Sequence, residues 1–153
     1  MFARALLIAG LLALPSLAVQ AQDSGTSLTI RIENVSAKGG ILRLGLYDRA
    51  SYPDDNAKPA AFADVPAQAG ETVVVLKNLT PGVYALEMFQ DINANGKMDQ
   101  SWIGLPLEPF GFSRDARPFL SKPGFDEVKF TLAPGENSQS VHLQHVLSLV
   151  ARK

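Results

Sequence analysis

Apolar side chains recur at every second position in several short stretches of this chain. In residues 27–34, Leu28, Ile30 and Ile32 alternate with polar residues, which is the period of a β-strand with one buried face. The same alternation, or a run of β-branched residues between turn signals, marks residues 39–48, 71–79, 83–91, 126–132 and 138–150. A helix would spread these apolar side chains around its axis, so the pattern predicts a protein built from short strands.

Short strands separated by turn signals, without a convincing amphipathic helix, predict an all-β sandwich of about seven antiparallel strands. Lys38, Gly39 and Gly40 predict a hairpin that returns the first strand onto the second. In residues 59–70, Pro59 and Pro66 limit any helix to a turn or two. Residues 101–125 are predicted to form one long ordered loop, because disordered segments are depleted in aromatic residues.

The N-terminal residues have the pattern of a cleaved export signal. Arg4 precedes a short apolar run, and Pro15 and small residues follow it up to Ala21, as in a secretory signal peptide. A membrane-spanning helix needs roughly 20 uninterrupted apolar residues, which this run lacks. We therefore expect residues 1–21 to be removed and residues 22–153 to form a single exported domain, periplasmic or secreted, without a transmembrane segment.

Composition narrows how this domain is stabilised and what it binds. The chain contains no cysteine, so disulfides cannot stabilise it, and its stability must come from packing or from a bound ion. Its formal net charge is -1 at pH 7, with charges of both signs interspersed along the chain. A nucleic-acid-binding surface needs a basic patch, so the composition argues against nucleic acid as a partner.

The stretch after the fourth predicted strand carries side-chain oxygens at alternate positions around an Asn-Gly pair. A hard cation such as Ca²⁺ takes about six to eight oxygen ligands, which a loop with regularly spaced donors can supply. The candidate metal ligands are the side chains of Asp91, Asn93, Asn95 and Asp99 and the backbone carbonyl of Lys97. Trp102 stands where the helix-loop-helix calcium motif has a bidentate glutamate. Any site is therefore predicted to be weak, with the missing oxygens coming from Glu108, Asp115, Asp126 or water.

A plain hairpin explains the same stretch equally well. Asn95-Gly96 between alternating apolar runs is among the clearest signals of a type I′ turn. Asp and Asn are also ordinary turn residues. The sequence leaves both interpretations open.

The long loop supplies candidate contacts for a partner. Its aromatic residues are Trp102, Phe110, Phe112, Phe119 and Phe125. A small satellite core that holds the loop on the sandwich is the favoured interpretation, because compact loops pack their own side chains. An exposed platform for a sugar or a peptide is the alternative. The candidate partner-binding residues are Trp102, Glu108, Phe110, Phe112, Arg114, Asp115 and Arg117.

Catalysis is the competing class of function, with hydrolysis of a cell-envelope carbohydrate as its best case. The carboxylates that could pair for glycoside hydrolysis are Glu108, Asp115, Asp126 and Glu127. That chemistry depends on the separation of two carboxyl groups in space. Ser113 lacks the second glycine of the nucleophile-elbow motif. His142 and His145 lie three apart in a predicted strand, so their side chains are expected on opposite faces, unlike a chelating pair.

Four stretches resemble a known family. They read GILRLGLYD, LTPGVYALEMFQDINANGKMD, SWIGLPLEPFGFSRDAR and PGFDEVKFTL. Over roughly residues 28–143 the chain resembles the exported bacterial family catalogued as domain of unknown function 2141. The resemblance implies a prealbumin-like, immunoglobulin-type β-sandwich, in agreement with the strand pattern, and it implies no particular biochemical activity.

A second, local resemblance concerns the Asp/Asn stretch, which is similar to the calcium loops of the B-type repeats in Gram-positive surface adhesins. Those loops also lie on a prealbumin-like sandwich, and they have an acidic residue where this chain has Trp102. Taken together, the residues and the resemblances predict an exported, non-catalytic binding or accessory module of the cell envelope. Its expected partner is a protein or a carbohydrate, and its expected ligand is a weakly bound calcium ion.

Overall fold

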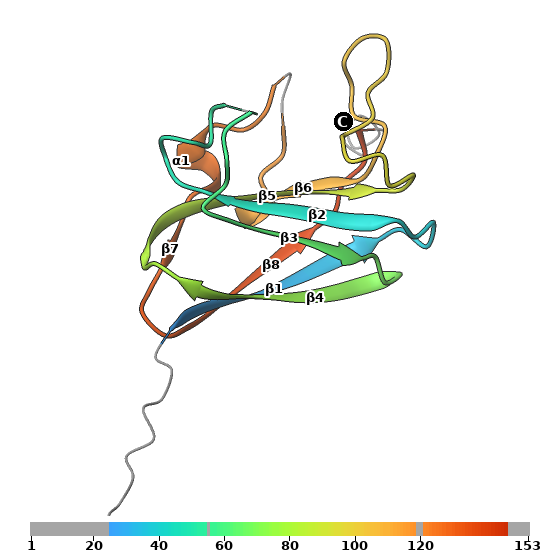
Figure 1. Cartoon of the computed structure of the whole chain (residues 1–153). Helices are drawn as coiled ribbons and strands as arrows, with labels where there is room; N and C mark the ends of the chain where they lie inside the picture. The colour runs from blue at the N-terminus through green and yellow to red at the C-terminus, as the bar shows by residue number, and fades with distance from the viewer. Residues whose placement is uncertain (1–24, 55, 119–120, 147–153) are drawn as a thin grey trace, which may run out of the picture.

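Two β-sheets face each other across an apolar core in the computed structural model of this protein, which describes residues 25–54, 56–118 and 121–146 (Figure 1). The elements in chain order are β1 (Thr26–Val35), β2 (Ile41–Tyr47), β3 (Ala61–Pro66), β4 (Gly70–Leu79), β5 (Gly82–Asp91), β6 (Phe110–Phe112), the 3-10 turn η1 (Ser113–Asp115), α1 (Phe125–Val128), β7 (Phe130–Leu132) and β8 (Glu136–His142). The predicted export signal, residues 1–21, lies outside the described residues. The eight strands of the described chain confirm the predicted β-sandwich.

The smaller sheet has the strand order β4-β1-β8, and the larger sheet has the order β3-β2-β5-β6, with β7 also paired to β5. β1 runs antiparallel to β4 but parallel to β8, so one pairing departs from the antiparallel expectation. The core side of β1 carries Leu28, Ile30 and Ile32, all fully buried, as the alternation predicts. Leu42 and Leu86 of the larger sheet belong to the same core.

The connection between β1 and β2 crosses from one sheet to the other and is not a hairpin. Gly39 and Gly40 turn the chain with φ angles of 76° and 87°, which glycine adopts without a steric penalty. The Gln90 side-chain amide holds this turn, donating to the carbonyls of Ser36 (3.0 Å) and Gly39 (2.6 Å). The hairpin prediction is wrong because β1 is paired on both edges, by β4 and β8, and offers β2 no free edge.

Four other segments differ from their predicted structure. The predicted long loop, residues 101–125, is interrupted by β6, which pairs with β5, and by η1. β3 forms where at most a short helix is expected, because antiparallel pairing with β2 along its whole length satisfies the backbone groups on its inner edge. Residues 126–128 belong to the short helix α1 and not to the strand predicted for residues 126–132. β8 ends at His142, so His145 lies beyond the strand, and strand alternation does not determine the direction of its side chain.

A second, smaller core lies on the other face of the larger sheet. Its buried members are Tyr52, Ala85, Phe110, Phe112, Phe125 and Val128. Neighbouring residues of β5 serve the two cores in turn, since Ala85 packs here and Leu86 packs in the main core. This cluster is the satellite core favoured for the aromatic loop, although Phe119 lies outside the described residues.

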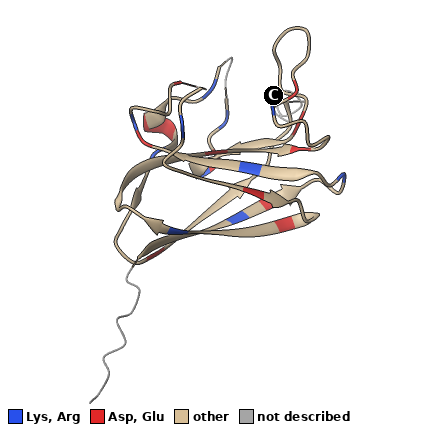
Figure 2. Cartoon of the chain, viewed as in Figure 1, with Lys and Arg blue, Asp and Glu red and all other residues tan. Residues whose placement is uncertain are grey.

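Charged side chains of both signs are interspersed along the strands and connections (Figure 2). The narrow loop that extends beyond the sheets differs, because it has no charged residue between Asp99 and Glu108 (Figures 1 and 2). Within the described residues, no helix combines the length and the apolar character needed to cross a bilayer. The extended loop and the polar turn from which it rises form the candidate functional site.

Candidate functional site

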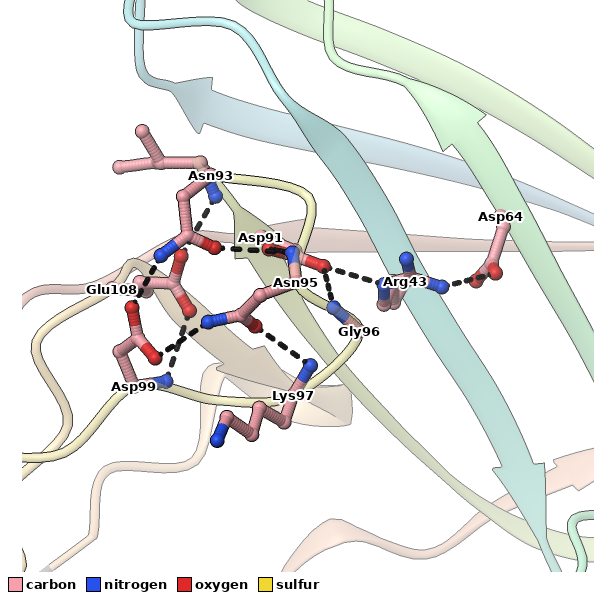
Figure 3. Close-up of polar contacts among 10 residues, drawn as sticks. Arg43, Asp64, Asp91, Asn93, Asn95, Gly96, Lys97, Asp99 and Glu108 are labelled. Carbon is pink, nitrogen blue, oxygen red and sulfur yellow. Dashed lines mark hydrogen bonds and ion pairs between the residues drawn. The ribbon is translucent and has the colours of Figure 1, made fainter.

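β5 ends at Asp91, a fully buried carboxylate that opens the Asp/Asn loop, residues 91–99 (Figure 3). Its Oδ2 accepts hydrogen bonds from Nε of Arg43 and from the N–H of Gly96, both at 2.8 Å, and its Oδ1 accepts one from the N–H of Asn95 at 3.1 Å. Burial by itself would raise the pKa of Asp91, but these hydrogen bonds outweigh it and leave the pKa lowered. Asp91 is therefore ionised inside the protein.

Arg43 of β2 supplies a positive charge to this carboxylate from a neighbouring strand. Its guanidinium also pairs with Asp64 of β3, so one side chain joins three adjacent strands. The hydrogen bond to Asp91 is the main cause of the raised pKa of Arg43. The guanidinium thus neutralises part of the negative charge that a metal ion would otherwise neutralise.

The two asparagines of the loop fold their side chains inward. Each Oδ1 accepts the backbone N–H two residues ahead, Asn93 from Asn95 at 3.1 Å and Asn95 from Lys97 at 3.0 Å, in the manner of Asx turns. Both Nδ2 groups then face the carboxylate of Asp99, at 2.6 and 2.8 Å. The alternate spacing of these residues therefore produces a hydrogen-bonded network (Figure 3).

Glu108 closes the network from the returning chain. It is 4% exposed, and its two carboxylate oxygens accept the N–H groups of Ile92 (2.7 Å) and Asp99 (3.1 Å). Of the three carboxylates considered for the missing metal oxygens, Glu108 is the one that lies at the loop. The other two are bonded elsewhere, Asp115 to His142 and Asp126 to Arg49. The loop therefore has a third carboxylate, supplied from beyond the contiguous motif.

The donors gathered at the loop are oxygens, the ligand type that Ca²⁺ prefers. Among the described residues, no three His, Cys, Asp or Glu side chains are placed to share one metal ion. A cation would therefore also depend on Oδ1 of Asn93 and Asn95, each of which has a second lone pair, and on the Lys97 carbonyl. The donors are of the type that a hard cation takes, and hydrogen bonds among the loop's own residues close the loop.

Residues 100–107, here called the apolar hairpin, rise from the Asp/Asn loop as a short two-stranded turn. Gln100 and Pro106 form a β-bridge, and the Leu107 N–H donates to the Asp99 carbonyl at 2.8 Å. Ser101 organises the tip, because its N–H donates to the Leu105 carbonyl (2.8 Å) and its Oγ accepts the Leu105 N–H (3.1 Å). The backbone of the hairpin is therefore bonded largely to itself.

The large side chains of the apolar hairpin face solvent. Their exposed fractions are 96% for Trp102, 57% for Ile103, 43% for Leu105 and 60% for Leu107. Four large apolar side chains thus lie within six consecutive residues, on a loop that extends from the sandwich (Figure 1). Contiguous exposed apolar surface of this kind marks interaction sites.

Three of the seven predicted partner-binding residues lie in the interior, so the prediction that they contact a partner directly is wrong. Glu108, Phe110 and Phe112 are between 4% and 7% exposed, because the first closes the Asp/Asn loop and the other two pack in the second core. The remaining four, Trp102, Arg114, Asp115 and Arg117, are exposed. Trp102 is the one that belongs to the apolar hairpin.

Sequence reasoning missed Ile103, Leu105 and Leu107 as candidate contacts. A signal for them exists in the run WIGLPL, which is apolar, uncharged and interrupted by Gly104 and Pro106. An apolar run with two turn residues cannot continue as a buried strand. Its side chains therefore have no neighbouring strand to cover them.

The carboxylates considered for glycoside hydrolysis are Glu108, Asp115, Asp126 and Glu127. The first two bond to the loop backbone and to His142. Hydrogen bonds from Arg49 and Lys129 hold the pKa of Asp126 well below its usual range, and the fourth carboxylate accepts the Gly124 N–H at the start of α1. Each of the four has a structural partner, and none of these contacts favours hydrolysis.

A comparison with protein-family models matches residues 30–140 to the family described as "Uncharacterized protein conserved in bacteria (DUF2141)". The match runs from within β1 to within β8 and so includes both loops of the candidate site. No curated protein matches the chain, and no solved structure matches it either.

Proposed function

The chain belongs to the uncharacterised bacterial family DUF2141, and from its geometry we propose that it is an exported, non-catalytic binding or accessory module. Its contact surface is the apolar hairpin, and its partner is a component of the cell envelope, the compartment expected from the N-terminal sequence. The Asp/Asn loop positions the hairpin. A weakly bound calcium ion at that loop is the second part of the proposal.

The exposure of the hairpin side chains is the observation that carries this proposal. Trp102 is 96% exposed at the tip of the loop, although tryptophan is a residue that proteins usually bury for the most part. Tryptophan is also enriched among the residues that dominate binding energy at interfaces. The three aliphatic side chains beside it extend the same apolar surface.

The rigid base of the hairpin supports the same function. Glu108 ties the start of the Asp/Asn loop to its end, since it accepts the N–H groups of both Ile92 and Asp99. Asp91 fixes the loop to β2 through Arg43. A contact loop that is ordered before binding loses less conformational entropy when the partner arrives.

The calcium ion would be held by the side-chain oxygens of Asp91, Asn93, Asn95 and Asp99 and by the carbonyl of Lys97. Its positive charge would offset the negative charge of the loop and stabilise the base of the hairpin. Because few carboxylates contribute, we expect a dissociation constant of about 10⁻⁴ to 10⁻³ M, as in extracellular modules. Such an affinity suits a compartment in which calcium is abundant.

Thermal unfolding with calcium tests the metal part of the proposal. At a calcium concentration about ten times the dissociation constant, the folded state gains about 1.4 kcal/mol, so the melting temperature rises. Asp99→Asn reduces the rise, whereas Asp126→Asn, which changes an exposed carboxylate outside the loop, leaves it intact. An equal rise with a sodium salt of matched ionic strength, or no rise in the wild type, rejects calcium binding.

Photo-crosslinking in cells tests the binding function. A photoreactive amino acid at position 103 of the hairpin is compared with one at position 73 of β4, since Val73 is also about half exposed, at 49%. We expect light-dependent adducts at position 103 and few at position 73. Equal labelling at the two positions, or none at position 103, removes the hairpin as the contact surface.

A further inference from the structure

We propose that the apolar hairpin inserts into the interfacial layer of a lipid bilayer. The inference rests on the proposed binding function and specifies the chemistry of the partner as lipid. Three properties of residues 100–107 support it: the absence of charged side chains, the backbone hydrogen bonds and the small size of the surface they offer.

The hairpin can enter an apolar medium without burying a charge. No charged residue occurs between Asp99 and Glu108, and charged side chains are the residues that most oppose entry into hydrocarbon. Trp102 lies at the tip, and tryptophan concentrates at the boundary between lipid headgroups and acyl chains. Ile103, Leu105 and Leu107 provide aliphatic surface for the same layer.

The backbone of the hairpin needs fewer hydrogen bonds from its surroundings than an open loop would. An N–H group that lacks a partner in lipid costs several kcal/mol. The N–H groups of Ser101, Gly104, Leu105 and Leu107 donate within the hairpin or to its base, whereas among the described contacts those of Trp102 and Ile103, in the turn, have no protein acceptor. Pro106 has no N–H group to satisfy. Ser101 Oγ, the hydroxyl at the tip, also has a partner in the Leu105 N–H. Four of the seven N–H groups of residues 100–107 therefore need no partner from the medium.

The surface of the hairpin is too small and too convex for a stable protein complex to rest on it alone. A specific protein interface buries about 800 Å² on each partner, from roughly 20 to 30 residues. The hairpin offers eight residues on a narrow protrusion (Figure 1). A second copy of this chain would present the same convex tip, whereas a bilayer accommodates a narrow tip without a matching surface.

The polar base sets the depth of insertion. From residue 99 to residue 102, where the chain turns, the backbone spans at most about 10 Å at about 3.3 Å per residue, which matches the depth of about 5 to 10 Å at which interfacial segments lie. Further entry would place Asp99, Glu108 and the exposed Lys97 in hydrocarbon. The Asp/Asn loop therefore stops at the headgroups.

Fluorescence tests the proposal directly, because Trp102 is the single tryptophan of the chain. The purified full chain is mixed with vesicles of phosphatidylethanolamine and phosphatidylglycerol. We expect the Trp102 emission to shift to shorter wavelength and lipids brominated on the upper acyl chain to quench it. Since the signal comes from the hairpin, lipid binding by another segment of the chain does not imitate it.

Two variants serve as controls. Trp102→Phe combined with Phe62→Trp moves the fluorophore to β3, where Phe62 is 66% exposed, and its emission should not respond to lipid although the protein still binds. Ile103→Asp, in the turn at the tip, should reduce the partition coefficient for vesicles at least about tenfold, with an unchanged melting temperature as the check on folding.

Unshifted and unquenched Trp102 emission at saturating lipid overturns the proposal, and so does equal quenching of the tryptophan at position 62. The photo-crosslinking experiment separates this failure from failure of the binding function. An adduct at position 103 that contains protein and no lipid rejects the bilayer and keeps the binding module. If no adduct forms at position 103, both bilayer insertion and the binding function are rejected.

Discussion

The Asp/Asn loop and the apolar hairpin follow each other in the chain, yet they are organised in opposite ways. In the loop, Asp91, Asn93 and Asp99 direct their side chains inward, to one another and to the backbone. In the hairpin, the backbone bonds to itself and the apolar side chains point outward. The loop residues therefore contribute mainly to stability and the hairpin side chains to recognition. Substitutions in the two segments should affect these two properties separately.

The largest expected effect comes from removing the buried carboxylate of the loop. Asp91→Ala leaves Arg43 without this partner and leaves the N–H groups of Asn95 and Gly96 without an acceptor, so we expect a loss of about 3 to 5 kcal/mol in the free energy of unfolding. Urea denaturation measures it. Asp64→Ala, which removes the exposed partner of the same arginine, should lose less than about 1 kcal/mol. Similar losses in the two variants would contradict the assignment.

Glu108→Gln should have an intermediate effect. The amide can accept one of the two N–H groups that the carboxylate now accepts, but its NH₂ group would face the other, at Ile92 or Asp99. We expect a loss of about 2 kcal/mol and faster hydrogen exchange at both of these amides. Glu127→Gln, a carboxylate that accepts one N–H at the start of α1, is the matched control. Unchanged exchange at Ile92 and Asp99 would show that Glu108 does not close the loop.

A smaller effect is expected from pH, at a contact that belongs to neither segment. The ring nitrogens of His142 lie 2.8 Å from a carboxylate oxygen of Asp115 and 3.2 Å from one of Glu33. The hydrogen bond to Asp115 is the main cause of the raised pKa of His142. Because the folded-state pKa is raised, the stabilisation is complete below the unfolded value of about 6.5 and is lost as pH rises through the folded-state value.

Between about pH 6 and about pH 9, the free energy of unfolding should therefore fall by up to about 1 kcal/mol more in the wild type than in His142→Gln. The difference is modest because the His142 side chain is 44% exposed. Trp102 emission should stay the same between the two pH values. A change in that emission would couple this contact to the hairpin and weaken the separation of the two segments.

The smallest expected effect on stability is that of Trp102→Ala. A side chain that is 96% exposed makes few contacts in the folded state, so the free energy of unfolding should change by less than about 0.5 kcal/mol. Vesicle binding should fall in the same variant. A loss of stability comparable to that of Glu108→Gln would mean that the tryptophan packs on the protein and is not held free for a partner.

Alternation predicts the buried faces of β1 and β2 because a side-chain period of two is a local property of the chain. It cannot predict the crossing between the sheets, since a Gly-Gly turn fits a hairpin and a crossing equally well. The partner of Asp91 is also hidden from sequence, because Arg43 lies 48 residues away. Trp102 and Phe110 show the same limit, as both are aromatic residues of one loop, yet one is exposed and the other is buried by contacts from distant segments.

The parallel pairing of β1 with β8 bears on how the chain reaches its fold. The first strand of the sandwich bonds to the last, and the Asn137 side chain donates to the Ser27 carbonyl across a separation of 110 residues. Such non-local contacts slow folding, because a long loop must close before they form. While the chain folds, β1 therefore keeps one edge open until the segment Glu136–His142 pairs with it. An open edge can pair with another chain, so a chaperone that covers β1 would have its greatest effect in that interval.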